Sequence, residues 1–238
     1  MKRSQRGVTL LELLIAVTLL SLLSVAMFTA MRLGLSAFTK ADSKLMLNRR
    51  VAGAQRILQS QLEGLVPATA LCGAGPAGGG ARYTFFQGDP AAMRLVSTFS
   101  LQGGWRGQPQ ILEIFVIPAE QRGVRLVVNE IPYTGSRGAG RQCTPGSNVP
   151  QFLPVAAAPT SFVLADELAF CRFLYLGHAQ DPNQPDVWSA AWRNNLLPLA
   201  VRIEMAPLDA DPSRVQPTSI TAPIYVRRDP EIPYEDKE

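Results

Sequence analysis

The sequence predicts an α+β protein in which one long N-terminal helix, transmembrane and then amphipathic, packs on an antiparallel β-sheet domain. Three observations predict this fold class. A long apolar run lies near the N-terminus, an apolar stripe of helical period follows it up to Pro67, and short β-rich segments separated by Gly, Pro and Asn make up the rest. With 238 residues the chain can bury a sizeable core, and one folded domain after the helix is the simplest arrangement.

The apolar run follows a short basic leader of residues 1–7. No charged residue lies between Leu13 and Met31, and a helix over residues 8–31 would be about 36 Å long, enough to cross a bilayer. This region is too long for a secretory signal peptide, and no small-x-small cleavage site follows it before Arg32. The sequence therefore predicts a transmembrane helix over residues 8–31.

Past this span the helix is expected to continue as an amphipathic helix over residues 32–66. Apolar residues recur at spacings of three and four, which is the period of one helix face. They are Leu47, Val51, Ala54, Leu58, Leu62 and Leu65. Pro67 ends the pattern, so we predict one helix over residues 8–66, about 88 Å long, whose second half packs on its own domain.

Residues 67–228 are expected to form the β-rich domain, followed by a tail of residues 229–238. Short runs rich in Val, Ile, Leu, Phe and Tyr predict strands at 93–100, 111–117, 124–129, 168–176, 199–205 and 220–226. Glycine and proline clusters between the predicted elements indicate a flexible loop at 72–80 and irregular loops at 103–104, 135–140 and 144–146.

The junction between leader and span carries a specific pattern: Gly7, then Val8-Thr9-Leu10-Leu11-Glu12-Leu13-Leu14. It resembles the signature of type IV prepilins and pseudopilins. The resemblance implies that a prepilin peptidase cleaves after Gly7 and methylates the new N-terminus on Val8, and that Glu12 pairs with a neighbour's amine during assembly. The residues agree, because an amine on Val8 would lie one helical turn from Glu12. A carboxylate inside a membrane costs up to about 2.5–3.5 kcal/mol and usually has a partner.

The resemblance covers two blocks, residues 1–66 and 160–227, and the second block makes it more specific. Asp-Glu-Leu-Ala-Phe-Cys-Arg-Phe-Leu-Tyr over residues 166–175, the Trp188 and Trp192 loop, and Asn-Leu-Leu-Pro-Leu-Ala-Val-Arg over residues 195–202 resemble the J-type minor pseudopilin of type II secretion. Thr29 stands where many major subunits have proline, which also indicates a minor subunit with a pilin-like fold.

The resemblance to J-type pseudopilins implies a role in assembly. Such subunits join I-type and K-type minor pseudopilins at the pseudopilus tip and start the filament that exports folded proteins across the outer membrane. The major pseudopilin and the prepilin peptidase are further implied partners. Two alternatives remain open: a minor pilin of a type IV or competence pilus, acting in assembly, adhesion or DNA uptake, and a membrane-tethered enzyme or binding protein that shares only the anchor.

Charge argues against a nucleic-acid partner. The chain has 23 basic and 19 acidic residues, but removal of Lys2, Arg3 and Arg6 with the leader leaves 20 against 19. The five basic residues that follow the span (Arg32, Lys40, Lys44, Arg49 and Arg50) would by themselves favour a cytoplasmic domain. The resemblance implies the opposite orientation: a single-pass protein of the inner membrane, with the N-terminus cytoplasmic and the C-terminal domain periplasmic.

Cysteine positions favour one disulfide. Cys72 and Cys143 lie beside Gly and Pro, whereas Cys171 lies within a predicted apolar strand. Since the periplasm permits disulfides, we predict a Cys72–Cys143 bond and a buried thiol at Cys171.

We expect no catalytic site. His178 is the single histidine, and the chain has no Cys-x-x-Cys, His-Glu-x-x-His or Gly-x-Ser-x-Gly motif. No cofactor is expected, although Asp181, Asn183 and Asp186 supply three oxygen side chains that would suit Ca²⁺. Trp188 and Trp192 are expected to anchor the loop or the core rather than a partner.

Overall fold

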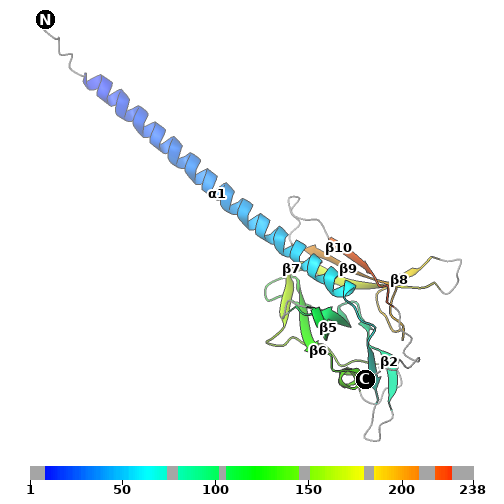
Figure 1. The fold of residues 1–238 in the computed structure, drawn as a ribbon. Coiled ribbons are helices and arrows are strands. Elements are labelled where there is room, and N and C mark those ends of the chain that lie inside the picture. Colours follow the sequence, from blue (N-terminus) through cyan, green and yellow to red (C-terminus); the bar gives the residue numbers. More distant parts are fainter. Residues whose placement is uncertain are drawn as a thin grey trace. The chain divides into compact units, whose positions relative to one another are not determined.

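The computed structural model describes the chain in six stretches, residues 9–73, 80–101, 106–144, 151–179, 185–208 and 218–226. The chain divides into two compact units, Met1–Arg49 and Arg50–Glu238, and each is described by itself. As expected, a long apolar helix is followed by an antiparallel β-sheet domain, so the fold class is α+β (Figure 1).

Helix α1 runs without interruption over Leu10–Glu63. Thr29 does not break it, because threonine, unlike proline, keeps its backbone N–H and has no ring to clash with the preceding turn. Its hydroxyl donates to the carbonyl oxygens of Val25 and Ala26 at 3.0 and 2.9 Å. The predicted end at residue 66 was wrong by three residues. The backbone of Val66 already donates to the Val96 carbonyl of the sheet at 2.9 Å, so the last residues before Pro67 belong to strand pairing rather than to the helix.

The large sheet is antiparallel throughout, with strand order β10-β9-β7-β6-β5-β4-β3 and β8 beside β7. Its strands are β3 (Gln87–Gly88), β4 (Ala92–Phe99), β5 (Arg106–Pro118), β6 (Val124–Pro132), β7 (Phe162–Gly177), β8 (Val187–Ser189), β9 (Ala200–Pro207) and β10 (Thr218–Pro223). All six predicted strands are present. β7 begins six residues before the predicted start, and the short strands β3 and β8 were not predicted.

Strand β7 bends, and the bend divides the sheet into two halves. Its first part pairs with β6 and its second part pairs with β9, with an irregularity between Leu168 and Phe170. Glu167 lies at this bend with φ 54, which is uncommon for a residue with a side chain. The sheet curls beyond the bend. Its curl brings β7 to the segment after β3, where the Phe173 backbone N–H donates to the Pro90 carbonyl at 3.0 Å, although β3 and β7 are not neighbours in the sheet order.

The main core lies between the last turns of α1 and the concave side of the curled sheet. Leu58, Leu62 and Leu65 of the predicted stripe are 0%, 2% and 6% exposed. They belong to one cluster with residues of the long strands β4, β5, β6, β7, β9 and β10, including Met93, Leu95, Leu112, Ile114, Leu126, Val128, Phe173, Tyr175, Val201, Ile203 and Ile220. Burial of each such side chain contributes about 1.5–3 kcal/mol, so this contact is the main attachment of the helix to the sheet.

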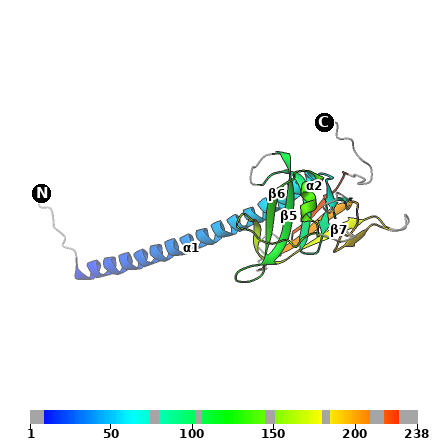
Figure 2. The ribbon, with the colours of Figure 1, turned by 90° about the horizontal axis from the view of Figure 1, so that it is seen from below.

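A second core covers the opposite side of strands β4 to β6. It contains a small sheet of β1 (Thr69–Cys72) and β2 (Ala81–Thr84), the short helix α2 (Ser136–Ala139) and the 3₁₀ turn η1 (Gly140–Gln142). Its buried members include Ala70, Phe85, Val96, Ile111 and Ala139. Figure 2 shows α2 close to β5 and β6.

Two of the predicted loops need correction. Residues 135–140 are not irregular, because they form α2 and enter η1. A Cβ on Gly140 would lie 2.2 Å from the Leu71 carbonyl oxygen, so this glycine permits close packing rather than flexibility. Cys72 at the start of the predicted 72–80 loop ends strand β1, while residues 74–79, 102–105 and 145–150 lie outside the described residues.

The bend in β7 gives a testable prediction at Gly123. This residue has φ +79, and a Cβ there would lie 2.3 Å from the Leu168 carbonyl oxygen; Gly135 has φ +87 but nothing within 4 Å. A positive φ costs an L residue about 1–3 kcal/mol at either site; at Gly135, ψ of 177 places the backbone in a region that is essentially restricted to glycine. We expect Gly123→Ala to cost about 1–3 kcal/mol more than Gly135→Ala, because only the former forces backbone apart. Urea unfolding of both variants measures the difference, and equal losses would contradict the close approach.

Candidate functional site

The start of α1 is built around Thr9 and Glu12. Thr9 precedes the helix, and both its hydroxyl and its carbonyl oxygen accept from the Glu12 backbone N–H at 3.3 and 3.1 Å. Thr-Leu-Leu-Glu has the spacing of an N-terminal capping box, a signal that the sequence contained and that helix periodicity alone does not reveal. It also places an acidic residue in the first turn, where the helix dipole favours negative charge.

The Glu12 carboxylate finds no cation within the described part of the chain. The first described basic residue along α1 is Arg32, twenty residues later and therefore about 30 Å away along the axis. Gly7 and Val8, the predicted cleavage and methylation sites, lie outside the described residues. A charge held in an apolar helix without a counter-ion on that helix needs one from elsewhere.

The helix surface over residues 13–31 carries no charged residue on any side. Leu10–Asp42 is a 33-residue segment of mean hydropathy 2.4, long and apolar enough to cross a membrane. Large side chains such as Leu10, Leu20 and Phe28 are 86%, 69% and 68% exposed. A soluble helix would bury such residues, so this segment fits a membrane anchor.

Hydroxyl groups within this segment are satisfied internally. Each one donates to a carbonyl oxygen three or four residues earlier, at 2.8–3.1 Å, in Thr18, Ser21, Ser24, Thr29, Ser36 and Thr39. Because the bilayer interior offers no water to bond, this arrangement removes the cost of placing hydroxyls there.

A comparison with protein families agrees with this geometry. The model of the prokaryotic N-terminal methylation motif matches residues 2–28. This is a prepilin signal of the type IV pilin kind. The match spans the leader, the cap at Thr9, Glu12 and most of the apolar segment. Comparison with curated proteins and with solved structures finds no match.

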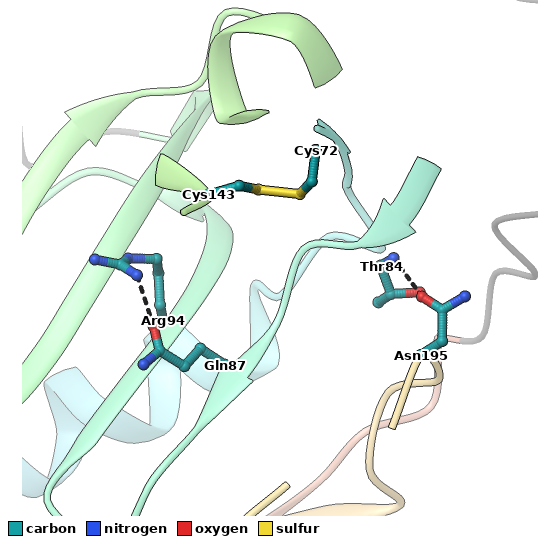
Figure 3. The surroundings of a disulfide bond; sticks show 6 residues. All are labelled: Cys72, Thr84, Gln87, Arg94, Cys143 and Asn195. Carbon is teal, nitrogen blue, oxygen red and sulfur yellow. Dashed lines mark hydrogen bonds between the residues drawn. A yellow bond between two sulfur atoms is a disulfide. The ribbon is translucent and has the colours of Figure 1, made fainter. Parts of the chain in front are cut away.

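In the β-domain, Cys72 and Cys143 form a disulfide, the pair that the sequence indicated, and Cys171 is free and buried. Figure 3 shows the bond joining the end of β1 to the residue after η1. Both cysteines are 6% exposed within the second core. Burial raises the pKa of the Cys171 thiol to about 12, which keeps it protonated and unreactive near neutral pH.

A buried polar cluster next to the disulfide was not predicted. The Arg94 side chain is 1% exposed, and its guanidinium donates to Glu113 Oε1 at 2.6 and 2.9 Å. It also donates to Gln87 Oε1 at 2.6 Å (Figure 3). Glu113 Oε2 accepts from Asn129 Nδ2 at 2.8 Å. A signal existed in the sequence, because Arg94 and Glu113 each interrupt an apolar run, but sequence alone does not show that the two face each other across β4 and β5.

The same cluster holds the segment of residues 151–161 on the sheet. Arg94 also donates to the Leu153 carbonyl at 3.1 Å, and Asn129 donates to the Ala156 carbonyl at 2.9 Å. Ser161 donates to Asn129 Oδ1 at 2.6 Å. Every donor of the cluster has a protein acceptor, which is the condition under which a buried charge pair is tolerated. The role shown is structural.

The remaining candidate residues lie in the loops around β8. Asp181 and Asn183 of the possible calcium loop lie outside the described residues, while Asp186 accepts from the Ala179 backbone at 3.2 Å and lies 3.8 Å from His178 Nδ1. Trp192 anchors its loop as predicted: its backbone donates to Gly88 and its indole donates to Leu196. Trp188 instead lies on the sheet face opposite the main core.

The disulfide gives a prediction for stability. It closes a loop with a sequence separation of 71, which in the chain-entropy model is worth about 4 kcal/mol. We expect Cys72→Ala/Cys143→Ala to lose about that much in urea unfolding of the full chain in detergent and to become insensitive to reducing agent. Cys171→Ala is the matched control and should keep the response to reductant. A double variant as stable as the oxidised wild type would contradict this.

Proposed function

We propose that this prepilin-type protein is a minor pseudopilin of a type II secretion system, part of the tip complex that starts the pseudopilus. The observation that carries the proposal is the methylation motif with Glu12 at the start of an uninterrupted apolar helix. Cleavage after Gly7 would place a new amine on Val8. That amine, on this chain or on a neighbour, is the counter-ion that Glu12 lacks within the described residues.

The helix surface supports an assembly role rather than a simple anchor. Leu33, Leu35 and Phe38 follow the first basic residue of the span and remain 70%, 58% and 73% exposed. Residues 10–31 alone would be about 33 Å long, which already covers the hydrocarbon core of a bilayer. Apolar side chains past that length gain most if helices of other subunits cover them. We therefore assign this surface to packing against the major pseudopilin and the I-type and K-type minor pseudopilins.

The disulfide supports the proposed orientation. Disulfides persist in oxidising compartments and are rare in the cytosol, so a Cys72–Cys143 bond favours a periplasmic β-domain. This argument outweighs the one from the five basic residues after the span, which by themselves would favour a cytoplasmic domain. The leader would then lie in the cytoplasm, at the face of the inner membrane where the prepilin peptidase works.

The secretion assignment, rather than a pilus, rests on the resemblance of residues 166–202 to J-type pseudopilins. These residues supply β7, β8 and the start of β9, which are hydrogen-bonded neighbours in the sheet. A minor pilin of a type IV or competence pilus is the second candidate, because the same N-terminal motif serves both kinds of filament. Neither assignment requires catalysis, and we propose no enzymatic activity.

Glu12 gives a direct test of the assembly role. We expect Glu12→Ala to leave the protein stable and cleaved after Gly7 but to reduce co-purification with co-expressed I-type and K-type pseudopilins by roughly tenfold, which corresponds to about 1.4 kcal/mol. Glu63→Ala removes an exposed acidic residue from the same helix and is the matched control. Equal recovery of the complex with both variants would remove the charge-pairing role.

Deletion of the gene in the native host separates the two filament systems. We expect loss of secreted proteins with twitching and DNA uptake intact. Normal secretion with lost piliation or transformation would assign the protein to a pilus instead. If neither trait changes, the assembly proposal fails and a tethered binding or enzymatic role replaces it.

A further inference from the structure

The two halves of the large sheet differ in what covers the side opposite the main core. Over β4 to β6 this side is buried by the second core. Over β7, β8, β9 and β10 it carries an open surface, which we call the outer face. The outer face includes Phe170, Arg172, Leu174, Leu176, Trp188, Arg202, Glu204 and Thr221.

Arginine and aromatic side chains dominate the outer face. The Arg202 guanidinium carbon lies 4.0 Å from the Trp188 ring centroid, and that of Arg172 lies 5.7 Å from the Phe170 ring. Arg172 pairs with Glu204 at 2.6 Å, and Arg202 donates to the Thr221 hydroxyl at 3.2 Å. Two arginines against one carboxylate leave a net charge of +1 on the outer face. Stacked arginines beside exposed aromatics are typical of binding surfaces.

The chain itself contains a segment of complementary charge after β10, beyond Arg227 and Arg228. Residues 229–238 have five acidic residues and one basic residue, a net charge of −4: Asp229, Glu231, Glu235, Asp236 and Glu238 against Lys237. Ile232 and Tyr234 lie among them and offer apolar contact. The charge and composition suit a surface of arginines and aromatic rings.

Chain length permits this segment to reach the outer face. Twelve residues follow Val226, and an extended chain of that length spans about 40 Å. Pro223 at the end of β10 pairs with Ala200, Ala200 pairs with Leu176, and Leu176 pairs with Trp188. Pro223 and Trp188 are therefore separated by three strand spacings, about 15 Å across the sheet. The twelve residues that follow Val226 are therefore long enough to reach Trp188.

We propose that the acidic segment of residues 229–238 docks on the outer face of its own β-domain, with its carboxylates at Arg202 and Arg172 and its apolar side chains on Trp188 and Phe170. The segment then acts as an intramolecular ligand that shields this surface from other proteins. The proposal is independent of whether the filament serves secretion or a pilus.

Hydroxyl-radical footprinting of the full chain in detergent tests the proposal, because it reports side-chain accessibility residue by residue. Removal of residues 229–238 should raise the oxidation rates of Phe170 and Trp188 by roughly twofold or more, since a docked segment shields the area it contacts. High salt should have the same effect on the intact chain, because it screens exposed charges. Phe162, which is 51% exposed on the other half of β7, serves as the internal control.

Two substitutions separate charge recognition from chain length. A full-length chain whose five acidic residues are replaced by Asn or Gln should behave like the truncated chain. Arg202→Gln removes the guanidinium that itself covers Trp188, so its readout is Phe170, which Arg202 does not stack on. Arg202→Gln should raise the oxidation rate of Phe170 in the full chain but not in the truncated chain, whereas Arg137→Gln, a substitution of an exposed arginine of α2, should change neither. Near-UV circular dichroism confirms that each variant keeps its fold.

Unchanged oxidation of Phe170 and Trp188 on truncation would overturn the proposal. Protection that appears only as protein concentration rises would overturn it as well, because the segment would then dock on a second copy of the chain. Protection that survives neutralisation of the acidic residues would rule out recognition by charge.

Discussion

The packing of Leu58, Leu62 and Leu65 against the curled sheet is the contact on which the folded unit depends. These three residues supply the helical side of the main core, and every long strand contributes side chains to the same cluster. The end of the helix is then fixed by the Val66 hydrogen bond to β4 and by Pro67. One continuous helix thus provides both an apolar anchor in its first unit and a core element in its second. No linker separates the two roles, because α1 is unbroken from Leu10 to Glu63.

The bend in β7 decides how the sheet is used. Before the bend, the strand extends a half-sheet that is buried on both sides, and after it the strand enters a half-sheet that has one open side. A buried sheet side must be apolar or fully hydrogen-bonded, and the Arg94 and Glu113 cluster meets the second condition. The open side accommodates Arg172 and Arg202 without a comparable buried hydrogen-bonded cluster. Arginine therefore has a buried structural role on one half of the sheet and is part of the open surface on the other.

The disulfide and the polar cluster stabilise the region that lacks a long helix or strand. The second core has small members such as Ala68, Ala70 and Ala139, and each buries little apolar area. A covalent bond between β1 and the residue after η1 compensates for this small core. The hydrogen bonds from Arg94 and Asn129 hold residues 151–161, whose own side chains are mostly exposed. This explains why segments that look like loops in the sequence are ordered in the fold.

By itself, the sequence determined the fold class, the long helix, the six main strands and the cysteine pair, because each depends on a local pattern of apolar period, turn residues or neighbouring residues. It also located the N-terminal methylation motif that includes Glu12, since that signal is contiguous. Only the tertiary structure decided the strand order, the bend at Glu167, the pairing of Arg94 with Glu113 and the open outer face. Those features join residues far apart in the chain, and their partners depend on how the sheet curls. Gly140 shows the limit well: the glycines of residues 135–140 indicate an irregular loop, whereas packing against the Leu71 carbonyl requires glycine at position 140 for close approach.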